Sequence, residues 1–206
     1  GDVEHFRPKS KFLWFAYCYE NFLLSCRICK GTKSDKHLFE NAFSPPAVPW
    51  ATGYAPSRDE VLAYAVDMDP DPLSQAGIDA YIQGCFDEEI HLPNPYYEDP
   101  ADLFAWEADD FLQEVRVVAA DASPRCQRAL SAAEAIIGLN RDELLTQRYF
   151  AFASARSLIE RNARDRANNI QVSQRDADLE QLMLSDRFPF AGMIRFFAPY
   201  WRSAFP

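Results

Sequence analysis

The chain has 206 residues, 48% hydrophobic and 25% charged, which is the composition of a globular protein with a buried core. Its longest apolar run, residues 12–19, is far shorter than a membrane span, and no secretory signal pattern is present, so we expect a cytoplasmic protein that does not contact a membrane. The net charge of −10 by itself argues against nucleic-acid binding, which needs lysine and arginine.

The distribution of charge changes that first interpretation. Residues 1–37 contain seven basic and four acidic residues, whereas the rest of the chain contains 14 basic and 27 acidic residues. A basic end on an acidic body is typical of a small module that faces nucleic acid and is attached to a scaffold. The alternative is that the basic residues cluster by chance.

The N-terminal part is predicted to form short elements separated by loops. Residues 1–8 resemble a strand that stops at Pro8, and residues 26–36 a short basic helix. Residues 44–58 contain four prolines and a glycine, so we predict a loop there and place the domain boundary in it. A short amphipathic helix is predicted over residues 59–66.

The middle of the chain is harder to interpret. Residues 78–86 fit a strand or a helix, and hydrophobic periodicity cannot decide between them. Residues 91–99 are rich in proline and predict a turn region. A strand is predicted near residues 115–119.

The C-terminal part is predicted to be helical because cap residues occur at regular places. Ser123, followed by proline, opens one helix and Gly138 ends it. Asn140 is predicted as the cap of a long second helix and Ser173 as the cap of a third. A last helix is predicted over residues 190–200. The predicted fold class is α+β, with a small module followed by a mainly α-helical body.

The first residues carry the chemistry. Hydrolysis of a phosphodiester needs a base that activates water and a cation that stabilises the phosphorane. A histidine can accept a proton near neutral pH, and a carboxylate can hold a hard divalent cation. His5 and Glu4 supply these groups on consecutive residues, and the amide of Asn21 could fix the loop that bears the base. A surface Glu–His pair is the structural alternative.

Five cysteines are too few and too scattered for a disulfide framework. Only Cys26 and Cys29 have the spacing of metal ligands. Two buried thiols are the alternative.

Taken together, these residues resemble the core of an HNH (ββα-metal) endonuclease, because Asn21 precedes Cys26 by five residues as in N-L-x-x-x-C-x-x-C. Residues 4–9 read Glu-His-Phe-Arg-Pro-Lys, which matches the E-H-F-R-P-K of one branch. Residues 12–17 and 33–38 are similar to its Y-x-W-L-A-Y and K-G-D-K-F-P segments. This branch is the HNH family found beside ATPases in bacterial anti-phage defence systems, including the PtuB subunit of Septu and retron-associated nucleases.

The resemblance continues beyond the first motif. Residues 92–100 are similar to the family's L-x-N-P-x-x-E-D-P segment, and residues 133–148 to its helical segment around L-N-R. Residues 188–195 are similar to its C-terminal end. The resemblance implies a ββα-metal nuclease module over residues 1–43 and a mainly helical scaffold or partner-binding region over residues 59–206.

The family implies a role for each residue that matches its motif. His5 would be the general base and Asn21 the orienting residue, with Glu4 a ligand of a catalytic Mg²⁺ or Mn²⁺. Cys26 and Cys29 would form half of a tetrahedral structural zinc site. Because the family supplies the other half from a C-x-x-C upstream of E-H-F-R-P-K, we expect residues to precede Gly1. The residues expected to grip the nucleic-acid backbone are Arg7, Lys9, Lys30 and Lys33.

Lys30 departs from the family pattern, which has Asn or His after the second cysteine, usually as a metal ligand. A protonated lysine has no acceptor and cannot ligate a cation. Three explanations stay open. Asp35 or His37 takes the ligand role, Lys30 contacts the scissile phosphate directly, or the site is impaired.

The resulting prediction is a metal-dependent HNH endonuclease subunit of an anti-phage complex. It would cleave DNA or RNA and bind an ABC-type or SMC-like ATPase (PtuA-like) and, in retron systems, a reverse transcriptase with its RNA–DNA hybrid. One alternative is a catalytically impaired HNH-like adaptor that assembles with the ATPase. Another is a zinc-ribbon protein that binds nucleic acid without catalysis.

Overall fold

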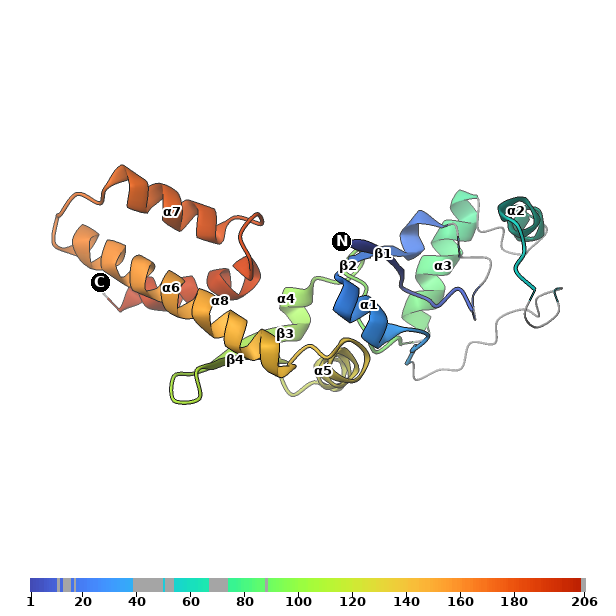
Figure 1. Cartoon of the computed structure of the whole chain (residues 1–206), viewed down its shortest axis with the longest axis horizontal. Coiled ribbons are helices and arrows are strands. Elements are labelled where there is room, and N and C mark those ends of the chain that lie inside the picture. Colours follow the sequence, from blue (N-terminus) through green and yellow to red (C-terminus); the bar gives the residue numbers. More distant parts are fainter. Residues whose placement is uncertain are drawn as a thin grey trace. The chain divides into compact units, whose positions relative to one another are not determined.

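The structure is a computed structural model that describes residues 1–10, 12, 16, 18–38, 50, 54–66, 74–87 and 89–204. It is a mixed α+β protein in which small two-stranded antiparallel sheets lie among helices (Figure 1). The contacts between residues divide it into two units. The first comprises residues 1–100 and 123–138, and the second comprises residues 101–122 and 139–206. No helix in the described ranges is long and apolar enough to cross a membrane.

The first unit is built on a short hairpin followed by a helix. Strand β1 (Asp2–His5) pairs with β2 (Phe22–Ser25), so that His5 lies opposite Phe22. A single 3-10 turn (Tyr19–Asn21) leads into β2, and α1 (Arg27–Lys33) follows it and packs on β1. The remaining helices of this unit are α2 (Arg58–Val66), α3 (Gln75–Asp87) and α5 (Pro124–Ile137).

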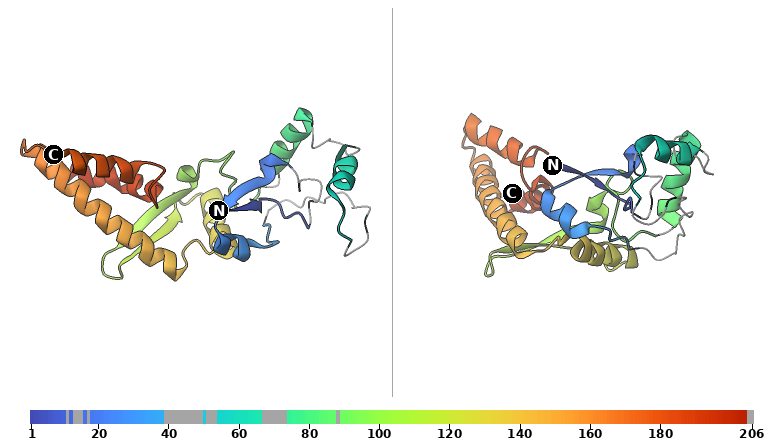
Figure 2. Two further views of the ribbon diagram at one scale, coloured as in Figure 1. Left: turned by 45° about the horizontal axis from the view of Figure 1, so that its top comes forward. Right: turned by 45° about the vertical axis from the view of Figure 1, so that its right-hand side comes forward.

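The second unit is a hairpin covered by three helices. The short helix α4 (Pro100–Leu103) leads into β3 (Phe104–Asp109), which pairs with β4 (Glu114–Ala119). Helix α6 (Asp142–Ala167) packs on β4. It also packs against α7 (Gln174–Leu184) and α8 (Ala191–Ser203), and the three helices lie together in both views of Figure 2.

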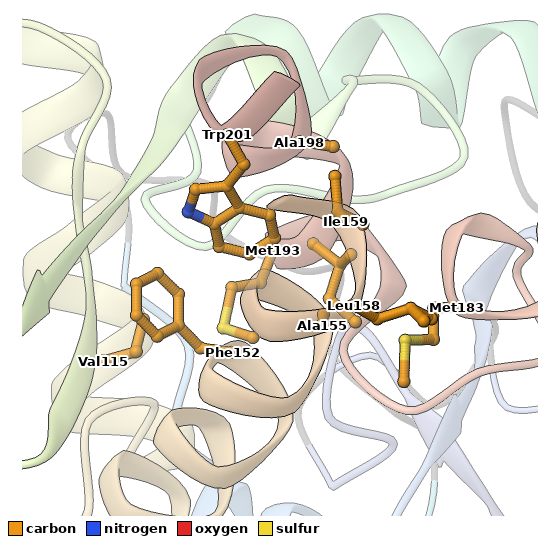
Figure 3. Close-up of a cluster of buried hydrophobic side chains, with 10 residues drawn as sticks. Val115, Phe152, Ala155, Leu158, Ile159, Met183, Met193, Ala198 and Trp201 are labelled. Atoms are coloured by element: carbon orange, nitrogen blue, oxygen red, sulfur yellow. The ribbon is translucent and has the colours of Figure 1, made fainter. Parts of the chain in front are cut away.

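The hydrophobic core of the second unit lies where α6 meets α8 and β4. Phe152 contacts Trp201 and Phe197 edge to face, with ring centroids 5.2 and 4.9 Å apart. Figure 3 shows Phe152, Met193 and Trp201 gathered between the two helices, and Val115 of β4 lies beside Phe152. Val115, Phe152, Met193 and Trp201 are at most 4% exposed.

Several predicted caps are confirmed, because a cap depends on neighbouring residues only. The hydroxyls of Ser123 and Ser173 accept hydrogen bonds from the backbone N–H of Cys126 and Asp176, at 3.3 and 3.2 Å. Gly138 ends α5 in the left-handed conformation, with φ of 61°, which favours glycine. Residues 78–86, left undecided by periodicity, belong to a helix, α3. Strands β2 and β3 were not predicted.

The prediction that Asn140 caps α6 is wrong. Arg141 occupies the N-cap position, and the Asn140 amide instead exchanges two hydrogen bonds with the backbone of Val117, at 2.9 and 2.8 Å. The same amide oxygen accepts a hydrogen bond from buried Arg148. Asn140 therefore forms hydrogen bonds with a residue distant in the sequence in place of the local capping hydrogen bond.

The division into units also differs from the expected boundary at residues 44–58, most of which lie outside the described residues. Helix α5, which we assigned to the C-terminal body, packs on α1 of the first unit. The ammonium of Lys36 donates to the carbonyl oxygen of Ala135 at 2.9 Å, which ties the two segments together.

A buried carboxylate connects the three helices of the second unit. Glu180 of α7 is 3% exposed and accepts hydrogen bonds from Asn162 and Arg166 of α6 and from Arg202 of α8, at 2.7–3.0 Å. Burial raises the pKa of Glu180, but the hydrogen bonds from Asn162, Arg202 and Arg166 lower it by more, so the net direction is downward.

We predict that Glu180→Gln destabilises the second unit by about 1–2 kcal/mol at pH 7. The reason is that the half-exposed guanidiniums of Arg166 and Arg202 lose the carboxylate charge with which both are paired. Since the folded pKa is lowered, this stabilisation is complete above the ordinary glutamate value of about 4.3 and is lost as pH falls through the folded value. Urea unfolding of the wild type and the variant at several pH values measures the difference. Glu107→Gln, at an exposed site on β3, is the control and should change little.

Candidate active site

His5 ends β1 and is held by two neighbours. Its ring packs edge to face on Phe22, with centroids 5.2 Å apart, and its Nε2 lies 3.0 Å from the carbonyl oxygen of Ala16. A carbonyl oxygen can only accept, so this contact assigns the hydrogen to Nε2 and leaves the lone pair on Nδ1. The half-buried imidazole is therefore oriented with one nitrogen able to accept a proton.

Asn21 fixes the chain immediately after His5. Its side chain is fully buried, its Oδ1 accepts from the backbone N–H of Arg7 at 2.8 Å, and its Nδ2 donates to the carbonyl oxygen of Arg7 at 3.1 Å. Its own carbonyl oxygen accepts from the N–H of Phe6 at 2.8 Å. Asn21 thus makes the contact expected of an orienting residue, and its part in catalysis stays a prediction.

Glu4 is placed differently from the expectation. Its carboxylate accepts a hydrogen bond from the ammonium of Lys33 at 3.0 Å, and the two side chains are only 12% and 4% exposed. The same ammonium donates to the carbonyl oxygen of His5 at 2.7 Å. The carboxylate expected to bind a cation therefore already has a cationic partner inside the protein.

Two of the four residues expected to grip nucleic acid are buried, which corrects that prediction. Lys33 is 3% exposed and turned toward Glu4, and Arg7 is 1% exposed with its guanidinium 5.0 Å from the centre of the Phe12 ring. Neither presents its charge at the surface in this structure, so neither is placed to contact a phosphate.

Lys9 and Lys30 are placed differently from that buried pair. Lys9 is exposed, and the ammonium of Lys30 is 3.9 Å from the carboxylate of Asp2, with both side chains about half exposed. Exposed pairs of this kind are weak and exchange readily. Their role in binding nucleic acid stays a prediction.

The expected alternative ligands do not assemble with Glu4. His37 packs its ring against Phe12 and Phe6, with centroids 5.2 and 6.5 Å away, and Asp35 is exposed. Within the described parts of the chain no three His, Cys, Asp or Glu side chains are grouped so that they could hold a metal. The prediction of a cation site formed by Glu4, Asp35 and His37 is therefore not supported.

Cys26 and Cys29 lie together at the start of α1. Cys26 is the N-cap, and its sulfur accepts a hydrogen bond from the N–H of Cys29 at 3.3 Å. Cys26 is exposed and Cys29 partly exposed. Thiolates at a helix start, three residues apart, fit two corners of a tetrahedral zinc site, and the described residues supply no third ligand.

Two features of this site were missed by sequence reasoning. The Ala16 carbonyl is a backbone group, so no pattern of residue types predicts that it holds the His5 ring. The ion pair of Lys33 with Glu4 joins residues 29 positions apart in the sequence, and no local sequence pattern predicts it.

Comparison of the chain with protein-family models, with curated proteins and with solved structures found no match.

We predict that Lys33→Met destabilises the first unit by about 3–5 kcal/mol, because it leaves the Glu4 carboxylate buried without a partner. Lys30→Met, at a half-exposed position on the same helix, is the matched control and should have little effect. Denaturant unfolding at pH 7 measures both.

The double variant Glu4→Gln with Lys33→Met should recover much of this loss, since no buried charge remains. If Lys33 instead serves nucleic acid, Lys33→Met would weaken binding while leaving the unfolding curve unchanged.

Proposed function

We propose that this protein is an HNH-type endonuclease subunit that hydrolyses phosphodiester bonds of DNA or RNA. The observation that carries the proposal is the oriented imidazole of His5 at the end of β1. Ala16 holds its Nε2, and the Asn21 amide holds the backbone of Arg7 two residues further on. The order hairpin, then helix, with a histidine on the first strand supports a ββα-type module.

In the proposed reaction Nδ1 of His5 accepts a proton from the attacking water, and the water oxygen bonds to phosphorus. The bond from phosphorus to the leaving oxygen breaks, and that oxygen takes a proton from solvent. The hydrogen bond from Nε2 to the Ala16 carbonyl strengthens as the ring becomes positively charged, because charge-assisted hydrogen bonds are the stronger kind. Lys9 and Lys30 provide positive charge at the protein surface for the phosphodiester backbone. General-base catalysis of this kind accelerates such reactions by about 10²–10⁴-fold.

A catalytic Mg²⁺ or Mn²⁺, which the resemblance implies, does not fit the described residues. Glu4 is paired with Lys33, and no cluster of three metal-binding side chains occurs in the described ranges. We therefore derive no step through a cation. A structural zinc fits Cys26 and Cys29 as two ligands, with the other two expected from outside the described residues.

The remaining expectations are part of the same proposal. The acidic helical body would bind an ATPase partner of the ABC or SMC type, and the protein would act in the cytoplasm as part of an anti-phage complex. Lys9 and Lys30 would face nucleic acid.

A second candidate function is an HNH-like adaptor that assembles with its partner and does not cleave. The specific observation in its favour is the Glu4–Lys33 pair, which occupies the expected metal ligand while the orienting contacts of Asn21 persist. An adaptor would need the fold of this module and not its chemistry.

We predict that the purified protein, with its partner where one is required, cleaves plasmid DNA or RNA and that His5→Ala lowers the rate by about 10²–10⁴-fold. His91→Ala in the same unit is the matched control and should cleave like the wild type. The assay is run with Mg²⁺, with Mn²⁺ and with a chelator. Equal rates for the wild type and His5→Ala would contradict the nuclease proposal, and absence of cleavage by both would favour the adaptor.

We predict further that the protein holds about one zinc ion through a four-ligand site in which Cys26 and Cys29 are two of the ligands. Elemental analysis should show that Cys26→Ser loses this zinc, whereas Cys126→Ala, at a buried cysteine on α5, retains it. Retention by Cys26→Ser would exclude the thiolate pair as ligands.

A further inference from the structure

One face of the β1–β2 hairpin carries exposed apolar side chains beside His5. In the register of the two strands, Val3 lies opposite Leu24. Two residues further along β1, His5 lies opposite Phe22. Because side chains alternate across a strand, these two pairs share a face. Helix α1 covers the opposite face, where it binds the carboxylate of Glu4. On the face of His5, Leu24 is 84% exposed and Val3 is 52% exposed.

Tyr19 extends this face with an exposed aromatic ring. It lies in the 3-10 turn that leads into β2 and is 83% exposed. Its ring contacts that of Phe22 edge to face, with centroids 5.8 Å apart. Phe22 in turn contacts the ring of His5, as described above. The rings of Tyr19 and Phe22 thus form an aromatic platform that leads directly to the proposed base.

The charges near the aromatic platform do not favour phosphate contacts there. Arg7 and Lys33, two of the cations expected to grip a phosphate backbone, are 1% and 3% exposed. Glu20, which follows Tyr19, is partly exposed and adds a negative charge. Duplex nucleic acid is bound mainly through its phosphates, whereas single strands are also held by bases stacked on aromatic rings. The platform therefore suits the neutral face of an unpaired base.

We propose that Tyr19 is a specificity residue of the His5 site and stacks on an unpaired base of a single-stranded DNA or RNA substrate. This inference rests on the proposed function, since it takes nucleic acid as the substrate of that site. A base on Tyr19 brings the adjoining part of the strand toward the imidazole, and Val3 and Leu24 extend the apolar surface that bases can contact. A duplex keeps its bases paired and stacked on one another, so it offers no base to Tyr19.

Fluorescence anisotropy with short labelled single strands and the matching duplexes, as DNA and as RNA, tests the proposal. The full chain is used, with its partner where one is required, in a His5→Asn background that removes the proposed base and keeps the strands intact. Single strands should bind at least about tenfold more tightly than duplexes. Tyr19→Ser should raise the single-strand dissociation constant by about 5–150-fold, the value of one stacked base. Tyr19→Phe keeps the ring and should bind within about twofold of the parent.

Tyr96→Ser is the matched control, since Tyr96 is 61% exposed in the same unit and lies outside the hairpin. Because stacking releases no counterions, Tyr19→Ser should leave the slope of binding against salt concentration unchanged. Equal affinities for single strands and duplexes, or equal effects of the two serine substitutions, would overturn the inference. The same conclusion would follow if Tyr19→Ser weakened binding of a protein partner and left the affinity for the strand unchanged.

The cleavage assay with His5→Ala separates this inference from the nuclease proposal. Cleavage that depends on His5, together with equal single-strand binding by the parent and Tyr19→Ser, would overturn the stacking role and leave the nuclease proposal in place. Binding of single strands that depends on Tyr19, without any cleavage, would support the stacking role and contradict the nuclease proposal.

Photo-cross-linking locates the stacked base without any substitution of Tyr19. Single strands that carry iodouracil at successive positions are irradiated with the protein, and the cross-linked peptides are identified by mass spectrometry. The main cross-linked peptide should contain Tyr19, because the halogenated base reacts with the aromatic ring on which it stacks. Cross-links only to peptides without Tyr19 would overturn the inference. Thermal unfolding confirms that each variant is folded, and a substitution at the exposed Tyr19 should leave the midpoint unchanged.

Discussion

The buried ion pair between Lys33 and Glu4 is the contact on which the arrangement of the first unit depends. It joins the last residue of α1 to β1, and the same ammonium holds the carbonyl oxygen of His5. Removing one partner from such a pair costs far more than the pair itself contributes, because the other charge is left buried. The geometry around His5 therefore depends on a lysine that does not touch the imidazole.

This pair also sets the chemical question for the site. His5, the proposed general base, is held in place, since Ala16 fixes the imidazole and Asn21 fixes the following backbone. The carboxylate that would help to hold a cation is instead neutralised from within by Lys33. A base without an evident cation site is compatible with hydrolysis or with a retained fold that only assembles. The substitution of His5 separates these outcomes because it removes the base and leaves the ion pair in place.

The second unit is stabilised differently, by contacts that centre on helix α6. Helix α6 is its central element, with a hydrophobic core toward α8 and a buried carboxylate, Glu180, toward α7 and α8. Asp110 fixes the β3–β4 turn to the same helix. One helix thus organises the core, the polar network and the exposed turn.

The sequence by itself determined the features that depend on neighbouring residues. The caps at Ser123 and Ser173 and the glycine end at Gly138 followed from local hydrogen bonding and backbone freedom, and the helical character of the C-terminal part followed with them. Only the tertiary structure decided that Asn140 bonds to Val117, that Arg7 and Lys33 are buried, and that α5 packs on α1. The physical reason is that a polar side chain takes whichever partner satisfies it once water is excluded. That partner lies many positions away in the sequence, so a pattern of neighbouring residues cannot predict it.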